Sequence, residues 1–196
     1  MIRETSSGPA ELASVALDIR DGRSTVVFTR DFLDAPDRVW IALTDPEQLA
    51  LWAPHTADRN LSSVGKVVFT MLGGVDDGTP AFDVPGAVLI ADKPTTLEHS
   101  WGTDVLDWRL AAVAAVNAVD EAAGSRLTLR HTLSDPEMAS AVAAGWHLCL
   151  EVADAVLAGK PTSPVRGSEA LKHGWQDLNE RYAAALGVEP SRIDQP

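Results

Sequence analysis

Two histidines are the side chains best placed to do chemistry, because each interrupts an otherwise apolar strand face. His99 shares a strand face with Leu97 and Trp101, and His131 shares a strand face with Leu129. A buried imidazole needs hydrogen-bond partners, and it can act as an acid or base or bind a hydroxyl or carbonyl of a ligand. The alternative interpretation places each histidine near the rim of a sheet, where backbone or water satisfies it.

Four tryptophans are predicted to face the interior between the sheet and the long helix. Trp52, Trp101, Trp108 and Trp146 each carry a large apolar surface and one indole N–H group. Packed together they fill a core, whereas spaced around a void they wall a pocket and orient a ligand. The sequence leaves both interpretations open.

Metal and nucleophile chemistry find little support. His147 and Glu151 are four residues apart, which puts both on one helical face, but no third ligand follows at a suitable spacing. We therefore expect a solvated helix face there. Cys149 lies on an apolar stripe without a base beside it, as a small buried residue does. No phosphate-binding loop, nucleophile elbow or dinucleotide fingerprint is present, so we assign no catalytic residue, no metal and no cofactor.

The elements that must position these residues begin with a hairpin. Apolar runs at 13–19 and 24–32 flank Asp21-Gly22, a pair that favours a tight hairpin turn. Pro36 and Pro46 then open two short helices, the second capped by Asp45.

Alternating polarity follows over five segments, at 66–72, 84–91, 97–101, 106–110 and 125–133. This pattern predicts an antiparallel sheet with one buried face. Within the second segment, Pro85 and Gly86 indicate a sheet edge or a bulge.

A long helix is predicted from Ser134, which has capping-box spacing to Glu137, to about Leu157. Its apolar stripe faces the sheet and its other side faces water. Residues 160–167 form a linker to a last helix over about 168–186, whose own stripe comprises Leu171, Trp175, Leu178, Tyr182 and Ala185. Either the main domain or a second copy of the chain must cover that stripe, so we expect a homodimer as one possibility.

This order of elements predicts an α+β, helix-grip fold. A curved antiparallel β-sheet wraps around a long C-terminal α-helix, and two short helices follow the first core strand. We divide the chain into a helix-grip domain over residues 1–159, with an N-terminal hairpin extension, and a linker plus C-terminal helix over residues 160–196.

The stretch APDRVWIALTDPEQLALW at 35–52 resembles the signature of the activator-of-heat-shock-protein-ATPase-like family, in the START-like (SRPBCC) superfamily. Gly65, Pro94, the run around His131 and Gly145-Trp146 extend the resemblance over roughly 24–157. The resemblance implies a helix-grip fold with an internal ligand cavity. Members of the superfamily include lipid carriers, hormone receptors, aromatase/cyclases and co-chaperone domains.

The composition limits the kinds of partner that the protein is expected to bind. The formal net charge is −12, which opposes binding to nucleic acid or to an anionic membrane surface. We find no apolar run long enough to cross a bilayer and no signal peptide, and the single cysteine suits a reducing compartment, so we expect a cytoplasmic protein. Arginine outnumbers lysine by 12 to 4, which is compatible with a bacterial source.

The leading functional hypothesis is a protein that binds a small hydrophobic or aromatic ligand in an internal cavity. One alternative is a cyclase, dehydratase or hydrolase that uses His131 or His99 as its acid or base. Another is an interaction or co-chaperone-like protein. The residues predicted to line the cavity share inward-facing positions on the strands and helices; they are Trp52, Val67, Phe69, Met71, Trp101, Trp108, Leu129, His131, Trp146 and Leu150.

Overall fold

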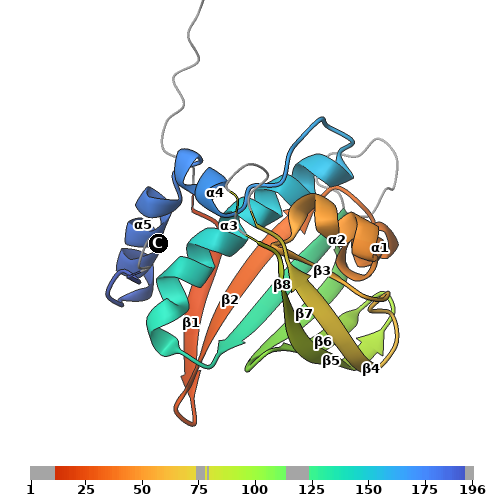
Figure 1. Cartoon of the computed structure of the whole chain (residues 1–196), viewed down its shortest axis with the longest axis horizontal. Helices are drawn as coiled ribbons and strands as arrows, with labels where there is room; N and C mark the ends of the chain where they lie inside the picture. The colour runs from red at the N-terminus through yellow and green to blue at the C-terminus, as the bar shows by residue number, and fades with distance from the viewer. Residues whose placement is uncertain (1–11, 74–77, 79, 114–123, 193–196) are drawn as a thin grey trace, which may run out of the picture.

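A curved antiparallel sheet and one long helix across it dominate the computed structural model, which describes residues 12–73, 78, 80–113 and 124–192 (Figure 1). The sheet has eight strands in the order β1-β2-β8-β7-β6-β5-β4-β3. Their bounds are β1 Ser14–Arg20, β2 Arg23–Phe32, β3 His55–Ala57, β4 Gly65–Met71, β5 Phe82–Asp92, β6 Thr96–Trp101, β7 Asp104–Val113 and β8 Gly124–Leu133. The predicted α+β helix-grip fold is confirmed.

The first hairpin forms as the Asp-Gly pair predicts. Asp21 and Gly22 both have positive φ, 50° and 75°, which is the backbone twist that a two-residue hairpin turn requires. β2 then pairs with β8, so two strands that are far apart in the sequence lie side by side, next to the β1 edge of the sheet.

Two short helices, α1 (Pro36–Thr44) and α2 (Pro46–Trp52), follow β2. Each has a proline in its first turn, and the Asp45 carboxylate caps α2 by accepting from the backbone N–H groups of Glu47 and Gln48. Figure 1 shows both helices beside one end of the sheet. They close that end over the buried side chains of Trp40, Leu43 and Trp52.

Two details of the sheet differ from the prediction. β5 lies between β4 and β6, so the edge suggested by Pro85 and Gly86 is wrong, and the register shift falls between Val88 and Ile90 instead. Gly86 is required because a Cβ there would lie 2.4 Å from the Ser100 carbonyl oxygen on β6 and 2.7 Å from Cε2 of the Phe69 ring. The short strand β3 was not foreseen, because three residues are too few to show an alternation.

The long helix begins as a 3-10 turn, η1 (Pro136–Met138), and continues as α3 (Ala139–Leu157). Asp135, not Ser134, supplies the cap, accepting from the Glu137 amide at 3.0 Å. The expectation that no segment is long and apolar enough to cross a membrane is also wrong. By length and composition alone Pro136–Leu157 could do so, because an 18-residue stretch of it has a mean hydropathy of 1.3. Two thirds of it is buried within the fold, as in the core helix of a water-soluble domain.

The chain itself covers part of the C-terminal stripe, at Leu178 and Tyr182, while Leu171 and Ala185 stay exposed. The predicted single helix is two, α4 (Ser168–Lys172) and α5 (Trp175–Leu186), separated at Gly174, whose φ is 79°. α5 packs along α3 and buries Leu178 and Tyr182 against it. The expected solvated face of α3 is therefore wrong at His147, which is only 2% exposed under Tyr182.

Candidate functional site

Three histidines from three different strands meet in the space between the sheet and α3. His55 on β3, His99 on β6 and His131 on β8 are each no more than 2% exposed. Leu106 on β7 pairs with both His99 and His131, so these two histidines belong to one row across the sheet. The curvature of the sheet brings β3 round to the same space, where the centroids of the His55 and His99 rings lie 6.4 Å apart.

His131 is held between the long helix and a carboxylate. The Trp146 indole N–H donates to His131 Nδ1 at 3.0 Å, and His131 Nε2 lies 2.9 Å from Asp104 Oδ2. Because an indole nitrogen can only donate, Nδ1 is the acceptor and the neutral ring carries its hydrogen on Nε2, which donates to Asp104. The other oxygen of Asp104 accepts from the Ser134 amide at 2.8 Å. Burial opposes the charge on Asp104, but the bonds from His131 and Ser134 keep the pKa of its carboxyl below the ordinary value.

His99 is held in the same way by a second tryptophan. The Trp108 indole N–H donates to His99 Nε2 at 3.3 Å, so His99 carries its hydrogen on Nδ1, 3.4 Å from the Ser100 carbonyl. Burial lowers the pKa of His99 to about 4. His99 and His131 therefore have both ring nitrogens engaged within the protein.

His55 and Trp101 differ from these two pairs, because each leaves a buried polar atom without a partner. His55 Nδ1 and Trp101 Nε1 make no hydrogen bond, and their rings lie side by side with centroids 5.1 Å apart. Burial lowers the pKa of His55 to about 3, so its imidazole is neutral at physiological pH. An unpaired buried polar group costs about 1–3 kcal/mol. Each of these two atoms can therefore still form a hydrogen bond inside the core.

The remaining tryptophans form an aromatic layer beside the histidines. Trp108 and Trp146 pack edge to face at 5.2 Å between centroids, and Trp52 packs against both at 6.2 and 6.4 Å. The Trp52 indole N–H donates to the Ala42 carbonyl at 3.0 Å, so it anchors α2 on α1 and is not available to a ligand. We call the three histidines with Trp52, Trp101, Trp108 and Trp146 the histidine–tryptophan cluster.

Eight of the ten residues predicted to line a cavity are buried at or beside this cluster. The other two are Met71, which is opposite His55 in the β3–β4 pair, and Trp101, and both are only partly buried. The buried ones are Trp52, Val67, Phe69, Trp108, Leu129, His131, Trp146 and Leu150.

Sequence reasoning missed His55 and Asp104. His55 lies in a strand too short to show a period, and Asp104 follows a turn at Gly102 with no pattern to link it to His131, 27 residues away. Only the pairing of β7 with β8 brings Asp104 and His131 together.

Metal or thiol chemistry gains no support from the described residues. Within them, no group of three or more His, Cys, Asp or Glu side chains is arranged to hold a metal ion. Cys149 is buried, and burial raises the pKa of its thiol to about 12. It therefore stays protonated and is not a nucleophile.

A curved antiparallel sheet that grips a long helix, with short helices at one end, defines the START-like class of α+β proteins. Residues 35–158 match the model of the activator of Hsp90 ATPase homolog 1-like proteins, and the chain belongs to this family. Among curated proteins, none matches the sequence significantly.

Solved structures share the fold at low sequence identity. CalU16 from Micromonospora echinospora is 20% identical, and its crystal structure superposes with a TM-score of 0.59 over 88% of this chain and 95% of that one. A protein of unknown function from Enterococcus faecalis, EF2215, is 14% identical with a TM-score of 0.58 over 87% and 91% of the two chains. A protein from Arthrobacter aurescens is 22% identical, with a TM-score of 0.56 over 75% and 92%.

Proposed function

We propose that this protein binds a small aromatic or apolar molecule bearing one hydrogen-bonding group, between the sheet and α3 at the histidine–tryptophan cluster. The observation that carries the proposal is the pair of unpartnered buried atoms, His55 Nδ1 and Trp101 Nε1. Five other members of the cluster use all their ring nitrogens in hydrogen bonds within the protein; they are Trp52, His99, Trp108, His131 and Trp146.

The chemistry of the two atoms defines the ligand's polar group. The indole of Trp101 can only donate, and the neutral His55 ring presents at Nδ1 either a lone pair or a hydrogen. A hydroxyl can accept from Trp101 and donate to His55 at once. Phe69, whose ring centroid lies 5.0 Å from that of His55, adds an apolar wall for an aromatic body.

Entry requires side chains to move, because the cluster is packed. Trp101 is the only one of its tryptophans that is not fully buried, and it lies at the end of β6 beside the turn at Gly102. We infer that a ligand enters by displacing Trp101 from its place against His55 and His131.

Binding accounts for the cluster better than the two alternatives. Acid–base catalysis by His131 or His99 needs a free ring nitrogen to meet the substrate, and both rings are fully engaged by Trp146 with Asp104, or by Trp108 with Ser100. A docking role for the C-terminal stripe needs a continuous exposed face, yet Leu178 and Tyr182 at its middle are buried on α3, and only Leu171 and Ala185 at its ends are exposed.

The test uses 2-naphthol and naphthalene as matched probes, with tryptophan fluorescence as the readout and native mass spectrometry of freshly purified protein beside it. We expect 2-naphthol to quench the tryptophans saturably and more tightly than naphthalene. His55→Phe should abolish that preference while keeping the binding of naphthalene. If neither probe binds saturably and the native spectrum shows only the mass of the bare chain, the proposal is wrong.

A further inference from the structure

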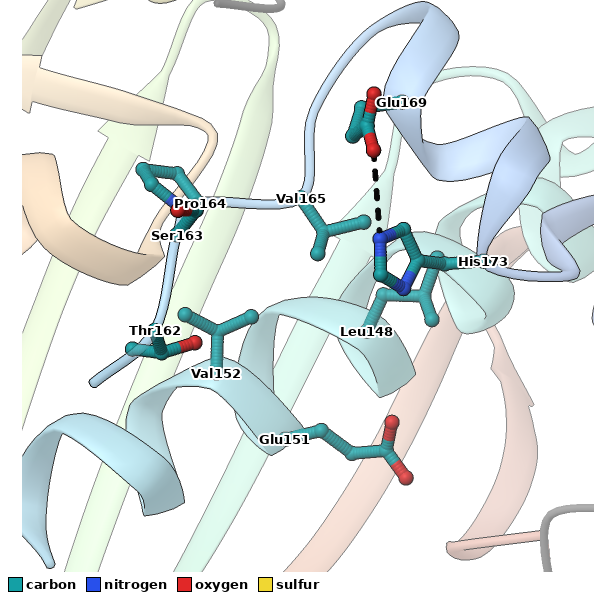
Figure 2. Close-up of a pocket in the computed structure, with 9 residues that line it drawn as sticks. All are labelled: Leu148, Glu151, Val152, Thr162, Ser163, Pro164, Val165, Glu169 and His173. Carbon is teal, nitrogen blue, oxygen red and sulfur yellow. Dashed lines mark ion pairs between the residues drawn. The ribbon is translucent and has the colours of Figure 1, made fainter. Parts of the chain in front are cut away.

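A hollow of about 460 Å³ lies on the outer side of α3 beneath the chain that leads to α4 (Figure 2). Its volume falls in the range of small-molecule sites, roughly 300–1,000 Å³. α3 supplies Leu148, Glu151 and Val152, residues 162–165 form the opposite wall, and the α4 region supplies Glu169 and His173. No member of the histidine–tryptophan cluster lines it.

The walls are fixed from both ends. The Arg166 guanidinium donates from Nε to the Ala53 carbonyl at 2.8 Å and from Nη2 to the Ala50 carbonyl, at the C-terminal end of α2. A cation is favourable at this end of a helix, where carbonyl groups are unpaired. Beyond α4, Tyr182 of α5 is locked onto α3 by its contact with His147. The hollow is therefore formed before any ligand arrives, which lowers the entropic cost of binding.

Its lining combines an apolar floor with acidic groups. Figure 2 shows Val152 on α3 and Val165 on the opposite wall pointing into the hollow, with His173 between Glu169, to which it is ion-paired, and Glu151 on α3. Contact with His147 lowers the pKa of Glu151, and the hydrogen bond from Lys172 lowers the pKa of Glu169. Both carboxylates are ionised at neutral pH, so the hollow favours an organic cation over an anion.

A buried ring nitrogen beside the hollow makes no aligned hydrogen bond within the protein. His147 Nε2 has no hydrogen-bond partner and lines a smaller hollow of about 130 Å³, which shares Leu148, Glu151 and His173 with the larger one. Glu151 Oε1 is 3.2 Å from this nitrogen, within ion-pair distance but outside hydrogen-bond alignment.

The hydrogen-bond network assigns a hydrogen to that nitrogen. The Tyr182 hydroxyl accepts from the Ala13 amide at 3.0 Å and lies 2.7 Å from His147 Nδ1. While it accepts from the amide, the phenol still has its own hydrogen to give to Nδ1, and the Glu151 carboxylate facing Nε2 favours this arrangement, with the ring hydrogen on Nε2. His147 Nε2 is thus a donor that faces Glu151 Oε1 at 3.2 Å without an aligned hydrogen bond, since the hydrogen on a ring placed next to a carboxylate is favoured on the facing nitrogen.

We propose that the hollow on the outer side of α3 is a second binding site, for a small organic amine with an apolar body and a neighbouring oxygen. The ammonium group meets Glu151, the apolar body lies on Leu148 and Val152, and the oxygen accepts from His147 Nε2.

Phenylalaninol, which carries all three groups, is the probe, and 2-phenylethylamine (no oxygen) and 3-phenylpropionate (an anion) are its matched controls. Titrations followed by amide chemical shifts in NMR should show phenylalaninol binding most tightly, the amine more weakly and the anion not at all. The shifts should move at 148–152 and 162–173 and not along β6 or β8. Shifts that map to β6 and β8, or an anion that binds as well as the amines, overturn the proposal.

Variants of the full-length chain separate the site from a general charge effect. Glu151→Gln keeps the shape and should weaken phenylalaninol about tenfold, because a charge-assisted hydrogen bond is lost. Val152→Trp should fill the hollow and abolish binding, whereas Glu180→Gln, at an exposed carboxylate on α5 outside the lining, should change nothing. Equal binding by Glu151→Gln and the unsubstituted chain, or no binding of phenylalaninol at millimolar concentration, contradicts the proposal.

Discussion

Trp146 on α3 donates its indole hydrogen to His131 on β8 across 3.0 Å, and this bond joins the long helix to the sheet. It lies in a chain of contacts that continues through His131 to Asp104 and the Ser134 amide. Every donor and acceptor in this series of hydrogen bonds has a partner. The series therefore fixes the rotation of α3 relative to the sheet as well as the tautomer of His131. The apolar stripe of α3 alone would allow several rotations.

Replacing Trp146 by phenylalanine should therefore destabilise the fold. The variant keeps an aromatic ring but leaves His131 Nδ1 buried without a donor, which costs about 1–3 kcal/mol beyond the loss of apolar area. Urea denaturation at pH 7 measures the change in the free energy of unfolding. Trp175→Phe, at a partly buried position on α5, is the control; an equal loss in both variants would contradict the role of this bond.

Low pH should weaken the fold through its buried histidines. His55 has a folded-state pKa of about 3 and His99 of about 4, both below the ordinary value of about 6.5. Between these limits the unfolded chain binds more protons than the folded one, so stability is full above pH ~6.5 and falls as the pH decreases. Each histidine contributes at most about 1.4 kcal/mol per pH unit.

His55→Phe tests this account directly. The variant removes an unpaired polar atom, so it should be about 1 kcal/mol more stable at pH 7 and should show a shallower loss between pH 6.5 and 4. Unfolding by urea at several pH values supplies both numbers. A variant that is less stable at pH 7, with an unchanged pH dependence, would show that His55 has a partner in solution.

Long periods in the sequence predicted most of the fold. β8 alternates over ten residues, and its inward positions Leu127, Leu129, His131 and Leu133 are all buried, because a one-residue slip would expose the whole set. The hairpin was predictable for a different reason: Asp21-Gly22 tolerates the positive φ angles that the turn imposes.

The candidate site was less accessible to sequence reasoning, because its geometry depends on pairings between distant segments. His131 and the four tryptophans could be named from their faces, but their bonds to Asp104, Ala42 and each other depend on the sheet register and the rotation of α3. The break at Gly174 was missed because a glycine inside an apolar helical period is tolerated in many helices. Only the backbone there, with φ at 79°, shows the interruption.

The segment between α3 and α4 depends on one side chain. Arg166 donates to two carbonyls of the α2 region, Ala53 and Ala50, and is half-buried beneath the segment it anchors. Arg166→Met keeps an apolar stem but loses both bonds, so thermolysin should cleave within 160–167 several times faster, while the global unfolding midpoint changes little. Arg109→Met, at an exposed arginine on β7, controls for loss of charge. Unchanged cleavage would show that α5, rather than Arg166, holds the segment in place.

Cys149 offers a sensitive report on whether the core opens as a unit. It is 5% exposed on α3, and burial raises the pKa of its thiol to about 12, so both access and thiolate formation are suppressed in the folded chain. We expect a disulfide reagent such as Ellman's to react with the native protein orders of magnitude more slowly than with the urea-unfolded chain. Trp146→Phe should speed the native reaction in proportion to its loss of stability, because reaction then requires unfolding of the contact between α3 and the sheet. If the native thiol reacts at the rate of a free cysteine, α3 separates from the sheet locally, and ligand entry at the histidine–tryptophan cluster would then be explained by movement of the helix rather than of Trp101.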